Sequence, residues 1–304
     1  MTTAPLAGNR RRQARERTIR RVFLAAAASS VLISGAIIAS LVGEAATFVL
    51  NVDLSSLSAI GWFPRRGFFD VRTIVVGTML VAGIAMLVAT PLGLGAAMYL
   101  SEYARPTVRK SLKPILEVLA GIPSVVLGFF ALSFLTPQVL KPIFGNNIAG
   151  FNMLAAGIGV GILTVPLVAS ITEDALRAVP RSLREASYGL GASRMSTSLR
   201  VVFPAAISGV VASLIIAFSR AIGETMVVAI ASGATGGSLF SLNVLQPGQT
   251  MTAAMAALAI GSDRVRGDDY AFQSLFFVGL ALFVLTLALN VLSERIVRRV
   301  RQKY

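Results

Sequence analysis

Two charged side chains, Arg220 and Glu224, stand four positions apart in an otherwise apolar stretch, residues 201–231 of this 304-residue chain. In a continuous helix this spacing places both groups on one face, about one turn apart. A guanidinium binds phosphate-like anions through paired hydrogen bonds and keeps its charge at physiological pH. A charge near the centre of a bilayer costs about 2.5–3.5 kcal/mol. If the stretch lies in a membrane, the pair predicts a polar path for an anion, with a structural ion pair as the alternative.

The composition indicates a membrane protein and excludes several kinds of chemistry. Hydrophobic residues make up 55% of the chain and charged residues only 14%, whereas soluble domains average about 25% charged residues. The chain contains no histidine and no cysteine, which excludes disulfide scaffolds, thiol nucleophiles, most zinc sites and a histidine general base. An intramembrane enzyme would have few candidate catalysts. We therefore expect neither an enzyme nor a metal site.

Six charge-poor segments are long enough to cross a bilayer, which requires about 20 mostly apolar residues per helix. They are residues 22–43, 73–101, 118–140, 152–172, 201–219 and 270–293. Because a backbone in lipid must satisfy its own hydrogen bonds, they predict an all-α membrane protein with six transmembrane helices. Gly157 and Gly161 form a GxxxG pair, which is typical of close helix packing. Residues 251–260 are apolar but too short to span, and predict a short external or re-entrant helix.

Lys and Arg residues gather in the two tails and in the loops after the second and fourth spans. Loops rich in these residues stay in the cytoplasm, so both termini are predicted to be cytoplasmic. The net charge of +14 then requires no nucleic-acid partner. The first apolar run is too long for a signal peptide and is expected to remain as an anchor helix. The predicted organisation is a basic tail at 1–21, the first span and an external loop at 22–70, a core domain of five spans at 71–297 with a cytoplasmic loop at 174–204, and a basic tail at 298–304.

The loop between the fourth and fifth spans predicts two short helices joined by a turn. Pro180 suits the first turn of a helix, and Gly189 and Gly191 suit its end because glycine readily adopts the left-handed conformation. Ser193 can cap a second helix, and Pro204 stands where the next span opens. Such a pair of helices can lie on the membrane surface and fit a groove in another protein. An ordinary solvated loop is the alternative.

The same loop resembles the E-A-A signature of ABC-transporter permeases, which continues with three residues, glycine, nine residues and I-x-L-P. The spacing is kept here, with three mild departures: Ser187 for alanine, Val201 for isoleucine and Phe203 for leucine. The resemblance implies the MetI-like architecture of ABC importer permeases. It also implies that residues 184–194 form coupling helices that dock into an ATPase subunit. The residues that it assigns to this coupling loop are Arg184, Glu185, Ala186, Ser187, Gly191 and Pro204.

Further motifs narrow the resemblance to the phosphate-uptake (Pst) permeases. They are SEYA at 101–104, GIPSVVLGFFAL at 121–132, DALRAVPRSLREAS at 174–187 and SRAIGETM at 219–226. The GETM ending is more similar to the PstC-type subunit than to its PstA-type partner. The resemblance implies a channel-forming subunit of an ATP-driven importer of inorganic phosphate that works by alternating access. It also implies that Arg220 and Glu224 lie on the phosphate path.

No GxxxxGK[ST] phosphate loop occurs in the chain, so ATP is expected on a partner subunit and no cofactor is expected in this chain. By resemblance, the partners are a PstA-type second permease, an ATPase subunit dimer, an external phosphate-binding protein, phosphate and the lipid of a bacterial plasma membrane. Trp62 and Phe63, in an external loop, are candidate anchors for that binding protein. Two alternatives stay open: an ABC permease for another oxyanion or small solute, and a secondary transporter that uses no ATP.

Overall fold

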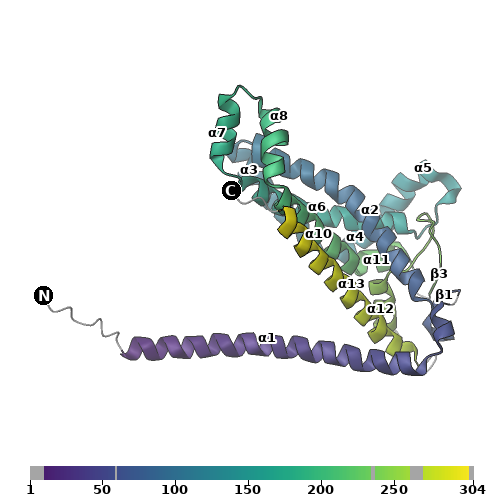
Figure 1. Cartoon of the computed structure of the whole chain (residues 1–304). Helices are drawn as coiled ribbons and strands as arrows, with labels where there is room; N and C mark the ends of the chain where they lie inside the picture. The colour runs from purple at the N-terminus through teal and green to yellow at the C-terminus, as the bar shows by residue number, and fades with distance from the viewer. Residues whose placement is uncertain (1–9, 59, 234–236, 261–269, 301–304) are drawn as a thin grey trace.

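The computed structural model describes residues 10–58, 60–233, 237–260 and 270–300, and this part of the chain is mainly helical (Figure 1). Five of its helices are long and apolar enough to cross a membrane: Gln13–Asn51, Val71–Tyr103, Ser124–Asn147, Met153–Arg177 and Ala271–Arg295. The pair Arg194–Ala205 and Ile207–Gly223, which is bent by 71°, brings the number to six when it is counted as one span. The prediction of an all-α membrane protein with six spans is confirmed, and the fifth span is bent just after Pro204, which removes a backbone donor.

The elements are divided by short breaks. The longer helices are α1 (Arg10–Asn51), α2 (Val71–Met98), α3 (Pro106–Ala120), α6 (Met153–Arg177), α10 (Ile207–Gly223), α12 (Met251–Ile260) and α13 (Ala271–Val300). Shorter helices are α4 (Ser124–Phe130), α5 (Lys141–Phe144), α7 (Arg181–Gly189), α8 (Arg194–Thr197), α9 (Phe203–Ala205) and α11 (Met226–Ala231). The π-helical segments are η3 (Tyr99–Tyr103), η4 (Ala131–Leu140) and η6 (Ser198–Val202), and the 3-10 turns are η1 (Leu54–Ser58), η2 (Pro64–Arg66) and η5 (Gly145–Asn147). The strands are β1 (Gly61–Phe63), β2 (Phe68–Phe69) and β3 (Ser238–Leu239).

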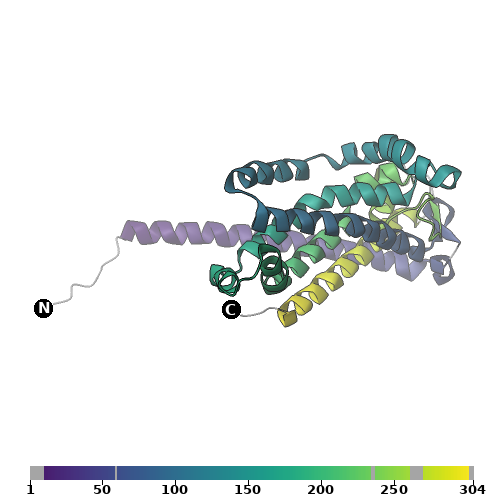
Figure 2. The same ribbon diagram turned by 90° about the horizontal axis from the view of Figure 1, so that it is seen from above.

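The centre of the bundle is the contact between α2 and α6. Glycines on α6 allow this approach, because a Cβ added to Gly157 would lie 2.6 Å from Ile84 and one added to Gly161 would lie 2.8 Å from Val88. The close packing predicted from the GxxxG pair is therefore confirmed. The helix α10 packs against α6 and α13, so these helices run side by side, as Figure 2 shows from above.

One end of the bundle is closed by a small sheet in the order β2-β1-β3, with antiparallel pairs. The Trp62 ring is 1% exposed and packs edge-on against Phe69, with Phe48 beside it. The suggestion that Trp62 anchors a partner is wrong, because this ring belongs to an aromatic core. The short helix predicted for residues 251–260 is confirmed as α12, which contributes Met251 to the same cluster.

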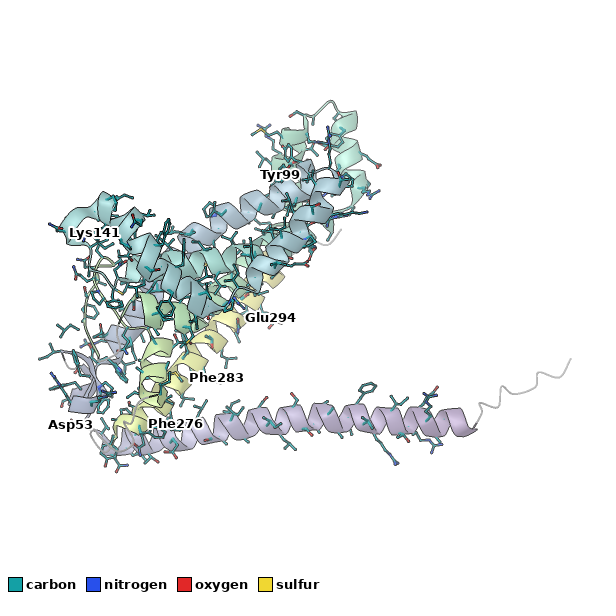
Figure 3. All side chains as sticks on the ribbon, turned by 180° about the vertical axis from the view of Figure 1, so that it is seen from behind. Asp53, Tyr99, Lys141, Phe276, Phe283 and Glu294 are labelled. Carbon is teal, nitrogen blue, oxygen red and sulfur yellow. The ribbon has the colours of Figure 1, made fainter. Side chains whose placement is uncertain are left out.

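The helix α1 stands apart from the bundle over most of its length (Figure 1). Its most apolar window is 0% buried. Among its residues 13–51, only Ala45 and Phe48, close to the C-terminal end, are buried, and Phe48 contacts Phe277 on α13. Figure 3 shows the side chains of α1 projecting into open space, and it shows Asp53 and Tyr99 at opposite ends of the molecule. We call the end near Tyr99, which also carries α7 and α8, the coupling end.

Candidate functional site

The first part of the site is a break in the fifth span beside Arg220. The helix α10 ends at Gly223, Glu224 has an extended backbone (φ −70°, ψ 127°), and α11 begins at Met226. Gly223 has a low helix propensity, which favours an end at this position. The prediction that Arg220 and Glu224 share one helix face is therefore wrong, because only Arg220 belongs to α10.

Glu224 is engaged by the backbone that follows it. Its Oε1 atom accepts hydrogen bonds from the N–H groups of Met226 (3.2 Å) and Val227 (3.3 Å), so it satisfies donors at the start of α11. Its backbone carbonyl accepts a hydrogen bond from the Thr252 hydroxyl of α12 (2.8 Å). Glu224 therefore fixes the break by joining the end of α10 to α11 and α12.

Arg220 borders a cavity of about 270 Å³ near the middle of α6. Its walls come from three helices: Leu116, Glu117 and Ala120 on α3, Leu163, Pro166, Leu167 and Ser170 on α6, and Arg220 on α10. Within the described part of the chain, Arg220 and Glu117 make no hydrogen bond or ion pair. The donors of the guanidinium are thus available to an anion that enters this cavity.

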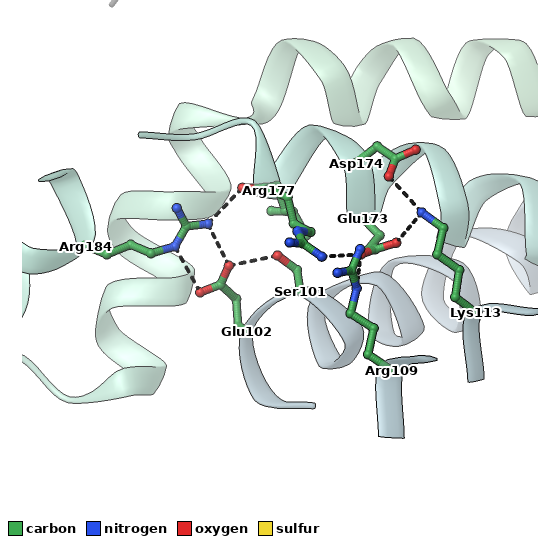
Figure 4. Close-up of polar contacts among 9 residues, drawn as sticks. Ser101, Glu102, Arg109, Lys113, Glu173, Asp174, Arg177 and Arg184 are labelled. Atoms are coloured by element: carbon green, nitrogen blue, oxygen red, sulfur yellow. Dashed lines mark hydrogen bonds and ion pairs between the residues drawn. The ribbon is translucent and has the colours of Figure 1, made fainter. Parts of the chain in front are cut away.

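The second part of the site is a buried carboxylate, Glu173, that the sequence analysis did not single out. Glu173 is 0% exposed near the end of α6, and it accepts a hydrogen bond from the Arg109 Nε atom at 2.7 Å. The Arg109 Nη2 atom also pairs with it, Lys113 lies 3.0 Å away and Arg177 lies 3.8 Å away (Figure 4). Two sequence signals indicate this cluster: the i, i+4 spacing of Arg109 and Lys113, and the i, i+4 spacing of Glu173 and Arg177.

Lys113 links α3 to two acids of α6. Its Nζ atom lies 3.0 Å from Asp174 as well as 3.0 Å from Glu173. The hydrogen bond to Asp174 raises the pKa of Lys113 above its usual 10.5, partial burial opposes this rise, and Glu173 adds to it. The ammonium therefore stays charged at physiological pH, and α3 stays paired with the end of α6.

Arg184, which the sequence assigns to the coupling loop, turns inward rather than outward. Its Nη2 atom donates to Glu102 at 2.9 Å, as Figure 4 shows, and to the Leu176 carbonyl at 2.9 Å. Its Nη1 atom donates to the Val179 carbonyl at 2.7 Å. The Glu102 side chain is only 4% exposed. Arg184 thus holds α7 to η3, which continues α2, and to the end of α6.

The coupling loop has the predicted form of two helices and a turn. Pro180 precedes α7, Gly191 has the left-handed conformation (φ 79°), and Ser193 caps α8 through the Ser196 N–H at 3.3 Å. The Ser187 hydroxyl lies 2.8 Å from the Thr197 hydroxyl, which joins α7 to the segment that follows. Three further residues of the predicted set, Glu185, Ala186 and Pro204, are exposed. The tip of the loop is apolar, since Leu190 is 90% exposed and Met195 is 64% exposed.

The two parts of the site have different chemical capacities. The cavity beside Arg220 can bind an anion, whereas Glu173 and Glu102 are held in ion pairs that join helices to one another. In the described part of the chain, no group of three or more acidic residues could hold a metal ion. The described residues thus combine a cavity with an unpaired guanidinium and a set of ion pairs that join α3 and α7 to α6.

Comparisons with known proteins agree with this geometry. The family described as "Binding-protein-dependent transport system inner membrane component" matches residues 89–302. The protein named phosphate transport system permease protein PstC 1 from Mycobacterium tuberculosis is 32% identical over 256 residues, which cover 78% of this chain and 75% of that protein. The phosphate transport system permease protein PstC from Mesorhizobium japonicum is 30% identical, with 95% of each chain covered.

Solved structures of ABC transporters have the same fold. A chain of a bacterial alginate ABC transporter, in complex with an alginate pentasaccharide-bound periplasmic protein, has a TM-score of 0.62 at 14% identity and covers 94% of this chain and 98% of that chain. A chain of the inward-facing MetNI methionine ABC transporter has a TM-score of 0.55 at 19% identity and covers 76% of this chain and 96% of that chain. The predicted MetI-like permease architecture is confirmed.

Proposed function

Because this chain belongs to the binding-protein-dependent transport system inner membrane components, and among them to the PstC phosphate transport permeases, we propose that it forms the channel of an ATP-driven importer of inorganic phosphate. It is a multi-pass protein of the cell membrane. The observation that carries the choice of substrate is Arg220, whose guanidinium borders a cavity between helices and has no partner among the described residues.

Phosphate suits this cavity for electrostatic reasons. A guanidinium presents a planar fork of donors that matches two phosphate oxygens, and it offsets part of the cost of bringing an anion into an apolar environment. Ser170, in the same wall, supplies a hydroxyl that can donate to a further oxygen. Glu224 lies on the same pathway. Its role there is to hold the helix break beside Arg220 through its hydrogen bonds to the start of α11.

ATP is bound and hydrolysed by a partner, and the coupling loop transmits its motion. The exposed apolar surface at the tip of α7 and α8, formed by Leu190 and Met195, is where an ATPase subunit would bind. Glu185 and Ala186 are exposed nearby. The inner side of α7 is fastened by Arg184 to α2 and α6. A push on α7 therefore reaches both helices and drives alternating access of the central cavity.

The full importer contains this chain, a PstA-type second permease, a dimer of ATPase subunits and an external phosphate-binding protein in the lipid bilayer. Both termini and the coupling end face the cytoplasm, in agreement with the distribution of Lys and Arg residues. The small sheet of β1, β2 and β3 lies at the opposite end, on the side where the binding protein would deliver phosphate.

The test is transport by the complete complex reconstituted in proteoliposomes. We expect ATP-dependent uptake of radiolabelled phosphate that collapse of the membrane gradients does not abolish. We also expect Arg220→Gln to lower this uptake at least tenfold at equal membrane abundance. Competition by sulfate or molybdate separates phosphate from other oxyanions. Uptake that follows the gradients rather than ATP would contradict the proposal and favour a secondary transporter.

A further inference from the structure

The cavity beside Arg220 has a second charged wall. Glu117 on α3 lines the same space of about 270 Å³ as Arg220 on α10, and most of the remaining wall is apolar. Neither side chain makes a hydrogen bond or ion pair with a described residue. A carboxylate and a guanidinium therefore border one cavity without forming an ion pair, although an ion pair would stabilise both groups.

A carboxylate and a phosphate compete for the same guanidinium. Both are oxyanions that accept two parallel hydrogen bonds from the donor fork of arginine, so both cannot hold that fork at once. Glu117 is attached to the cavity wall, which gives it a high effective concentration once the walls approach. The negative charge of Glu117 also repels a phosphate ion that lies next to it. A tethered carboxylate can thus displace a bound phosphate without entering the solvent.

The helix that carries Glu117 is connected to the coupling end. Arg109, Lys113 and Glu117 recur every four residues, so they lie along one side of α3. The first two pair with Glu173 on α6, close to the start of α7. α3 contains no fully buried residue, and it ends at Ala120 before a separate helix starts after Pro123. A displacement of the coupling end can therefore move α3 as one piece, and Glu117 with it.

We propose that Glu117 is a gating carboxylate, which pairs with Arg220 at the stage when the cavity closes and thereby releases phosphate. The proposal rests on the proposed phosphate pathway and adds to it a positioned competitor for the substrate. Its step is an exchange of ion pairs: the guanidinium leaves the phosphate oxygens and binds the Glu117 carboxylate, and no covalent bond changes.

The first test measures turnover of the reconstituted complex with Glu117→Gln, Glu117→Asp and a control, Glu44→Gln, whose side chain is exposed on α1. We expect Glu117→Gln to lower kcat for phosphate at least tenfold without raising KM, because release slows while binding persists. Glu117→Asp should recover most of the rate, and Glu44→Gln should match the wild type. A wild-type kcat in Glu117→Gln, or a raised KM with unchanged kcat, would overturn the proposal.

The second test does not depend on transport. Because the chain contains no cysteine, Glu117→Cys and Arg220→Cys together create the only thiols that can be bridged within it. A short bifunctional maleimide is applied to the nucleotide-free complex and to the complex with a non-hydrolysable ATP analogue. The yield of the intramolecular bridge, measured by mass spectrometry, should differ at least threefold between the states. Equal yields in the two states would show that the separation of positions 117 and 220 does not change with nucleotide, and would overturn the proposal.

Failure of the gate is distinguishable from failure of the proposed function. If the wild-type complex imports phosphate and Glu117→Gln does so equally well, the function stands and the gate is wrong. If the wild-type complex imports another oxyanion instead, the phosphate assignment is wrong. The kinetic comparison is then made with that oxyanion, and a tenfold loss in Glu117→Gln still supports the gate.

Discussion

At the coupling end, Glu173 is completely buried and surrounded by Arg109, Lys113 and Arg177. The middle of the same helix, α6, lines a cavity together with Arg220 of α10. Arg220 has no partner among the described residues. Pro166, in the wall of this cavity, and Glu173 are seven positions apart in α6, which corresponds to about 10 Å along the helix axis. Within this short distance the chain changes from charges held in ion pairs to a charge without a partner among the described residues.

This difference separates two roles for charge in a membrane protein. A buried ion pair is costly to form and costly to break, so its partners hold the attached helices in one arrangement. An unpaired guanidinium beside an apolar cavity contributes nothing to packing and is available to a ligand. We infer that the coupling end transmits force through its ion pairs, whereas the cavity handles the substrate.

The largest expected effect is the loss of the charge on Glu173. Glu173→Gln leaves three cations next to a buried neutral amide, and the removal of one partner from a buried ion pair costs about 3–5 kcal/mol. We expect a decrease of this size in the free energy of unfolding of the purified complex. The control is Asp174→Asn, because the Asp174 side chain is 65% exposed, and exposed pairs contribute about 0–1 kcal/mol. Equal losses in the two variants would contradict the special role of Glu173.

Arg220 should show the opposite behaviour, with a large effect on transport and little effect on stability. A hydrogen bond to a charged group contributes about 1.5–3 kcal/mol, so Arg220→Gln should lower kcat/KM for phosphate by about tenfold to a hundredfold. The unfolding midpoint should not change. Arg184→Gln is the matched arginine variant, and it should lower the midpoint because it leaves the nearly buried Glu102 unpaired. A large loss of stability in Arg220→Gln would instead indicate a structural ion pair.

A smaller effect is expected at Glu224, where two substitutions separate the capping role from the charge. Glu224→Ala removes the acceptor for the Met226 and Val227 N–H groups and should cost about 1 kcal/mol of stability. Glu224→Gln keeps a carbonyl oxygen in a similar place and should cost less than half of that. If both variants transport phosphate equally poorly although Glu224→Gln is stable, the charge itself acts on the pathway.

Much of the fold could be predicted from the sequence because it depends on local signals. The lengths of the charge-poor segments predicted the spans, since a bilayer has a fixed thickness. Pro180, Gly191 and Ser193 predicted the two coupling helices, because each residue has a backbone preference of its own. The break after Gly223 was missed, because the apolar pattern continues through it and the cap bonds of Glu224 depend on the helix that follows.

The ion pairs at the coupling end could not be predicted for a different reason. Glu173 and Arg109 are 64 residues apart, and Glu173 stands at the edge of an apolar span among other charged residues, as an exposed residue would. Its burial depends on the packing of α3 against α6, which no local pattern specifies. The cavity that joins Glu117 to Arg220 is likewise a product of three helices that are distant in the sequence.

The smallest expected effect concerns the pH dependence of Lys113, which tests whether the ion pairs at the coupling end act through charge. The hydrogen bond to Asp174 raises the pKa of Lys113 above 10.5. A raised pKa in the folded state means that the stabilising contribution is fully present below 10.5 and is lost as the pH rises through the folded value. Around this ammonium lie Glu173, Asp174, Arg109 and Arg177. Lys113→Ala should therefore be less stable than the wild type by at most about 1 kcal/mol at neutral pH, because the side chain is partly exposed.

The difference between the wild type and Lys113→Ala should disappear when the pH exceeds the folded pKa of Lys113, since both chains are then neutral at this position. Arg109→Ala is the control, because a guanidinium keeps its proton and its difference from the wild type should persist over the same range. Unfolding of the detergent-solubilised complex, measured from neutral pH up to strongly alkaline pH, makes the comparison. If the Lys113→Ala difference persists at the higher pH, this residue holds α3 to α6 through packing of its aliphatic stem, and the contrast with the open cavity would rest on Glu173 and Arg109 alone.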